Sequence, residues 1–165
     1  MLTPWKYGAG LLALLAFAGV GRADDAAPPK FYRLDFIVKA VEGSRVLNSR
    51  TYSTIVSTEN GANVAIRTGT KVPIQNGTSY TYADVGVNID CNRVHETEGG
   101  LALNVSADLS SLPPEATNST IPVIRQNSWR SPVIVQIRKP TVLFSSDDLT
   151  SKQQMQLELT ATPIH

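Results

Sequence analysis

The sequence predicts an all-β protein with mainly antiparallel sheets in a sandwich-like arrangement, about eight to ten strands and at most one short helical turn. Apolar and polar residues alternate with a period of two along most of the chain. Pairs such as Asn60-Gly61 and Asn76-Gly77 mark turns between these runs, because both residues tolerate positive φ. The runs themselves are rich in Val, Thr and Tyr, which favour extended backbone.

Residues 1–23 have the layout of a secretory signal peptide, with Lys6 before an uncharged apolar stretch and Arg22-Ala23 after it. The stretch is shorter than the roughly 20 residues that span a bilayer, which favours cleavage after Ala23 over a retained anchor. Residues 24–30 contain two acidic residues and a Pro-Pro pair, which predict a flexible leader. We expect one β domain over residues 31–165.

The charge and the cysteine content exclude several classes of protein. Beyond residue 23 the chain carries 13 basic and 14 acidic residues, so nothing in its charge favours nucleic acid as a partner. An exported chain with Cys91 alone cannot close an internal disulfide, so its stability must come from core burial or from association with other chains.

The first half of the domain contains one clear hairpin and one interrupted strand. Residues 31–41 alternate as a half-buried strand, a turn follows at 42–44, and the polar run 45–58 predicts a weakly buried or edge strand that pairs with the first. Between the two Asn-Gly turns lies a short strand. Gly69 and Pro73 are expected to interrupt it, because glycine favours a bend and proline lacks an N–H donor, and this places the strand at a sheet edge or a sharp bend.

The second half begins with the clearest alternation in the chain, in which residues 85–92 and 101–109 pair as a hairpin around a polar loop. A surface loop at 110–120 follows. Three further β segments are predicted at 121–129, 131–139 and 141–145, with Pro122, Pro132 and Pro140 at their beginnings, and a last strand at 153–164. Only residues 146–154 are compatible with a helical turn, capped by Ser146 or Asp147.

Candidate reactive groups are few, and we predict no catalytic, cofactor-binding or metal site. His95, Glu96 and Glu98 lie in the expected hairpin loop without the second histidine of a zinc helix. Cys91 shares a face with Val87 and Ile89, so we expect a buried thiol that does not pair with His95. The pair Asp147-Asp148 lacks the further ligands of a calcium loop and is expected to cap a turn.

The order of the β segments resembles the carboxy-terminal domain of bacterial secretins, the outer-membrane channels of type II and type III secretion and of type IV pili. The most specific part is "YADVGVNID" (residues 82–90), and the resemblance covers about residues 54–164. It implies a secretin-like core fold. Two departures stand out: "SSDDLTSKQQ" occupies the place of the family's gate, and only about 25 residues separate Phe31 from the start of the resemblance, where the family has ring-building domains.

These features favour an exported, noncatalytic β protein of the bacterial envelope, in the periplasm or at the outer membrane, that acts through protein contacts and uses no cofactor. Its envelope partner is unspecified, association with secretion or pilus machinery is possible, and we expect a monomer or small oligomer without a gated ring. A glycan- or ligand-binding module is the alternative, because five aromatic residues could form a stacking surface: Tyr32, Tyr52, Tyr80, Tyr82 and Trp129. A subunit of a secretion channel and a small hydrolase are the remaining hypotheses.

Overall fold

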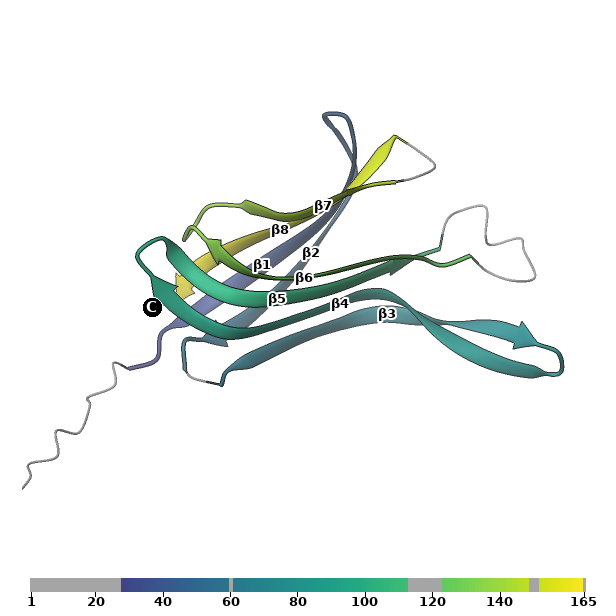
Figure 1. Ribbon diagram of the computed structural model, residues 1–165, viewed down its shortest axis with the longest axis horizontal. Helices are drawn as coiled ribbons and strands as arrows, with labels where there is room; N and C mark the ends of the chain where they lie inside the picture. The colour runs from purple at the N-terminus through teal and green to yellow at the C-terminus, as the bar shows by residue number, and fades with distance from the viewer. Residues whose placement is uncertain (1–27, 60, 113–122, 149–151, 165) are drawn as a thin grey trace, which may run out of the picture.

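The computed structural model describes residues 28–59, 61–112, 123–148 and 152–164, which form two four-stranded antiparallel sheets (Figure 1). Sheet I has the strand order β2 (Arg45–Ser57), β1 (Phe31–Glu42), β8 (Gln153–Ile164), β7 (Thr141–Asp147). Sheet II has the order β3 (Asn63–Asn76), β4 (Ser79–Thr97), β5 (Gly100–Ser111), β6 (Arg125–Val135). The all-β prediction and the number of strands are confirmed. The described residues include no helix that could cross a membrane.

The core lies between the two sheets because each strand there turns its apolar residues to the same side. Leu34 and Phe36 of β1 and Leu157 and Leu159 of β8 are fully buried on the inner face of sheet I. They meet the alternating apolar residues of sheet II, which are Val87, Ile89, Cys91, Leu101, Leu103, Val105, Ala107, Leu109 and Val135. This is the period-two pattern that predicted the central hairpin.

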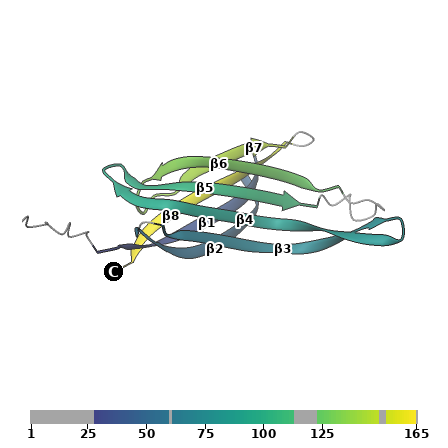
Figure 2. The same cartoon turned by 60° about the horizontal axis from the view of Figure 1, so that its bottom comes forward.

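The two sheets pack closely near the C-terminus and diverge towards the other end of the molecule (Figure 1). Seen from a second direction, the strands of sheet I run obliquely behind those of sheet II, as expected for twisted sheets in a sandwich (Figure 2). Strands β3 and β4 are longer than their neighbours, and β5 pairs with β4 only from Val87 onwards. Residues 70–85 therefore project as a two-stranded hairpin.

Three local predictions are wrong. Strand β3 is not interrupted: its register with β4 runs unbroken through Gly69 and Pro73, because Gly69 lies opposite Gly86 and the two glycines let the backbones approach closely. The expected position of this strand at a sheet edge is confirmed. Strand β6 continues through Pro132, which was expected to begin a separate segment. Ser146 and Asp147, expected as a helix cap, belong to β7, while residues 149–151 lie outside the described part.

Candidate functional site

The turn between β4 and β5 is shorter than the sequence suggested. Strand β4 extends to Thr97, so His95 and Glu96 lie on a strand and not in a loop, and Thr97 Oγ1 donates a hydrogen bond to the Gly100 carbonyl at 3.2 Å. A bulge at Arg93, with φ of 54°, shifts the register before His95. The shift turns Val94 into the core, where it is buried, and leaves His95 exposed.

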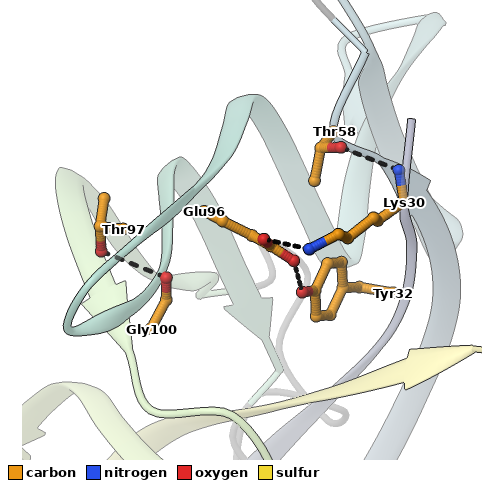
Figure 3. Close-up of polar contacts among 6 residues, drawn as sticks. All are labelled: Lys30, Tyr32, Thr58, Glu96, Thr97 and Gly100. Atoms are coloured by element: carbon orange, nitrogen blue, oxygen red, sulfur yellow. Dashed lines mark hydrogen bonds and ion pairs between the residues drawn. The ribbon is translucent and has the colours of Figure 1, made fainter. Parts of the chain in front are cut away.

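Glu96 links the two sheets at the end of the molecule where they pack closely (Figure 3). Lys30 Nζ lies 2.6 Å from Glu96 Oε2, and the Tyr32 hydroxyl donates a hydrogen bond to Glu96 Oε1. Lys30 is itself fixed to the end of β2, since its backbone N–H donates to Thr58 Oγ1 at 3.0 Å. Glu96 comes from sheet II, whereas its partners lie at the start of β1, so these four residues form an inter-sheet clamp.

The electrostatics of the clamp suit a structural role. The hydrogen bonds from Lys30 and then Tyr32 hold the pKa of Glu96 below its ordinary value. Burial, followed by the hydrogen bond to Glu96 and its charge, raises the pKa of Tyr32 to about 12. At neutral pH Glu96 therefore stays ionised and Tyr32 stays protonated. Neither group has a pKa near 7, which general acid–base catalysis favours.

The other candidate groups do not converge. Cys91 is buried, as predicted, and burial with the charge of Asp90 raises the pKa of its thiol to about 12. The His95 ring instead contacts the Arg93 carbonyl through Nδ1 at 3.0 Å. In the described part of the chain no three His, Cys, Asp or Glu side chains gather as metal ligands.

Asp147 and Asp148 close the hairpin between β7 and β8. The Asp148 N–H donates to the Gln153 carbonyl at 2.8 Å, and Asp147 Oδ1 accepts from Gln154 at 2.8 Å. Asp148 also forms an ion pair with Arg125 of β6, which links the two sheets. The acidic pair is thus engaged in local structure.

The five aromatic residues considered for a stacking surface are dispersed. Tyr32 is in the core, and Trp129 packs against Phe144 with ring centroids 6.2 Å apart. Only Tyr80 and Tyr82 are exposed among the five. These five residues therefore do not form the common stacking surface that the hypothesis of a glycan- or ligand-binding module requires.

A cleft of about 680 Å³ lies where the sheets diverge. Its walls include Val38, Tyr52 and Met155 from sheet I and Val85, Leu109 and Ser110 from sheet II. The cleft is wide, and its ionisable lining residues include Arg125 and Asp148, which pair with each other. Among its described lining residues, the hydroxyls of Ser110 and Ser146 donate to backbone carbonyls and not to a carboxylate or imidazole.

The outer strands of the two sheets have backbone groups that no described strand pairs with. Strands β2 and β3 are consecutive and lie at one flank, while β6 and β7 lie at the opposite flank. Each flank therefore carries one outer strand of each sheet. No described strand pairs with the outer side of these four strands, so their outward backbone groups remain available for pairing.

Exposed apolar side chains accompany these edges. Val46, Leu47 and Ile55 are exposed on β2, Ile134 on β6 and Val142 on β7. The polar sequence of β2 indicated an edge strand, which is confirmed. The grouping of the four edges into two flanks was missed, because it depends on the order of strands in space and has no local signal in the sequence.

Comparisons with known proteins give a likeness of fold. No protein-family model matches the sequence, and no curated protein matches it. Among solved structures, the secretin-domain β-barrel of InvG from the Salmonella injectisome matches with a TM-score of 0.51 and 7% identity, over 83% of this chain and 62% of that one. A second structure of the Salmonella secretin InvG gives 0.50 and 6%, over 83% and 64%.

The type II secretin GspD of enteropathogenic Escherichia coli also matches, with a TM-score of 0.47, 9% identity, and 83% and 67% of the two chains. This chain spans less than two thirds of the InvG chains. The fold is that of a secretin domain, and the resemblance predicted from the sequence is confirmed at that level. The match also extends towards the amino terminus beyond residues 54–164, which make up about two thirds of the chain.

Proposed function

We propose that the protein is an exported, noncatalytic β-domain protein of the bacterial envelope with a secretin-related role, and that it acts through protein contacts at its two flanks. The observation that carries the proposal is the pair of open edges on each flank of a secretin-like fold. An exposed edge strand is a ready template for pairing with another β chain.

The partner that the flanks fit best is a second copy of the chain. Each sheet has four antiparallel strands, so its two outer strands run in opposite directions. A copy in the same orientation would therefore bring its β7 antiparallel to β2 and its β6 antiparallel to β3. Such a contact joins two different surfaces, which is a head-to-tail arrangement.

The charges at the edges of sheet I support this contact. Strand β2 carries Arg45 and Arg50 and no acidic residue, whereas Asp147 is the only ionisable residue of β7. Asp147 pairs with Gln154, which pairs with Val41, which in turn pairs with Val46. If the neighbouring copy is not shifted along the strand direction, its Asp147 would therefore lie beside the end of β2 that carries Arg45.

Small assemblies fit these edges better than a large ring. Strand β7 has 7 residues against 13 in β2, so only part of that edge can pair. Pro73 and Pro132 each remove a backbone donor from an outer strand. We therefore keep the expectation of a monomer or small oligomer and of no gated ring.

Cross-linking between engineered cysteines tests the arrangement. We expect the double variant Arg45→Cys, Asp147→Cys of the exported protein to form dimers and short ladders with a bifunctional maleimide. Each single variant should give no dimer, because a head-to-tail contact needs one cysteine from each flank. Light scattering and electron microscopy of the unmodified protein give the size of the assemblies.

Dimers from either single variant would instead indicate a symmetric contact and contradict the head-to-tail proposal. A monomer at all concentrations that does not cross-link would remove self-association. Detergent-resistant rings would contradict the expectation of small assemblies and favour a channel subunit.

A further inference from the structure

The projecting part of the β3–β4 hairpin ends in a tip that carries no charged residue. The pair Gly69 and Gly86 marks its base, and beyond it the two strands pair only with each other among the described residues (Figures 1 and 2). Lys71 and Asp84 form an exposed ion pair at 2.9 Å just above the base. From there to the turn at 76–79 the hairpin carries no charged residue.

Apolar and aromatic side chains are accompanied by one uncharged polar side chain on each face of this charge-free tip. Val72, Ile74, Thr81 and Ala83 lie on the face that continues the core side of sheet II, where Val72, Ile74 and Ala83 are half-buried and Val72 lines the cleft. Pro73, Gln75, Tyr80 and Tyr82 occupy the other face. Tyr80 and Tyr82 are 61% and 66% exposed, the highest values for large hydrophobic side chains among the described residues.

We propose that this tip, residues 72–83, binds a lipid surface by lying in the headgroup region of a bilayer. Tyrosine suits that region because its ring contacts the acyl boundary while its hydroxyl remains hydrated. The apolar side chains of the opposite face add contact area, and the Lys71–Asp84 pair stays in water. This inference does not depend on how the flanks associate.

The geometry limits how deeply a single hairpin can enter. The four residues of each strand without charge, 72–75 and 80–83, extend about 13 Å, against a hydrocarbon core of about 30 Å. Both edges of the two-stranded tip have backbone groups without partners, and these would remain unsatisfied in hydrocarbon. In the headgroup region water satisfies them. A lone copy should therefore bind at the interface and not span the bilayer.

The absence of charge also separates a lipid surface from an electrostatic or protein partner. Binding should occur on neutral phosphatidylcholine vesicles, with little change when salt is raised or anionic phosphatidylglycerol is added. A requirement for anionic lipid, lost at high salt, would contradict the proposal. So would a defect confined to self-association, because the hairpin would then be a protein contact.

Vesicle co-sedimentation of the exported protein tests the inference. We expect Tyr80→Ser, Tyr82→Ser to reduce partitioning into phosphatidylcholine vesicles about tenfold or more, since two large exposed rings are removed. The matched control Phe31→Ser, Val123→Ser removes exposed side chains, 48% and 60%, that lie outside the tip and outside the four outer strands, and it should bind like the unmodified protein. Unfolding curves must show that both variants fold.

Depth is measured with Tyr82→Trp and lipids brominated at different positions along the acyl chain. Stronger quenching by the shallow bromine is expected. Stronger quenching by the deep bromine would contradict interfacial binding. Equal sedimentation of the tyrosine double variant and the unmodified protein, or no binding by either, would overturn the role of the tip.

Discussion

Replacing Gly86 by alanine should destabilise the protein, because the Cβ has no room between the paired strands. A methyl group built there would lie 2.1 Å from the Thr68 carbonyl oxygen and 2.4 Å from Gly69 Cα, whereas real Cβ contacts lie above 3.0 Å. Both obstructing atoms belong to the backbone of β3, so a change of rotamer cannot relieve the contact. The two strands must move apart by about 1 Å at this point.

The size of the effect follows from what that movement breaks. Overpacking of this kind typically costs about 1–3 kcal/mol, and the loss of one neighbouring ladder bond adds about 1 kcal/mol. The Gly86 N–H also donates to Ser110 Oγ at 2.8 Å, which couples the site to β5. We expect Gly86→Ala to lower the free energy of unfolding by about 2–4 kcal/mol.

Urea unfolding followed by fluorescence measures this directly, because Trp129 is the only tryptophan after residue 23. The midpoint should fall by about 1–2 M with an unchanged slope. The matched control is Gly99→Ala, whose Cβ would meet Ile134 Cγ2 at 3.6 Å, an ordinary contact. That variant should stay within about 0.5 kcal/mol of the unmodified protein. Equal stability of Gly86→Ala and Gly99→Ala would refute the close approach of β3 and β4.

The remaining predictions concern titration, reactivity and processing. Because the pKa of Glu96 is lowered in the folded state, its stabilisation is present above the ordinary carboxyl pKa and lost as pH falls through the folded value, so Glu96→Gln should flatten the acid limb of a pH–stability curve. Tyr32, with its pKa raised to about 12, stabilises below pH 10 and loses that contribution as pH rises towards 12, so Tyr32→Phe should flatten the alkaline limb. Cys91 should react slowly with a thiol reagent in the native state and rapidly in urea, and equal rates would place it at the surface. Intact mass of the exported protein should give Asp24 as the first residue, and a retained leader would contradict the predicted cleavage.

The sequence predicted the parts of the fold that depend on strict alternation. Leu101, Leu103 and Val105 had to share one face in any strand, and they are core residues. Prolines and glycines were less reliable guides. Pro132 was expected to begin a strand, yet β6 continues through it because an outer strand tolerates a missing donor.

The inter-sheet clamp could not be predicted from the sequence. Lys30 and Glu96 are 66 residues apart, and they meet only because β1 and the end of β4 face each other across the sandwich. Glu96 was expected in a loop because its neighbours are polar and two glycines follow. The bulge at Arg93 changes the register of β4 without a local sequence signal that distinguishes it from a turn.

The same strand order that leaves four edges open also couples them. A copy placed against one flank meets both sheets at once, so pairing at the β2 edge raises the local concentration of the β3 edge for its own partner. Each edge is weak alone, because β7 is short and Pro73 and Pro132 remove donors. Association through two weak, linked edges is cooperative. Blocking either edge should therefore abolish most of the self-association. If the two contacts were independent, blocking one edge would remove only the part of the self-association that this edge contributes.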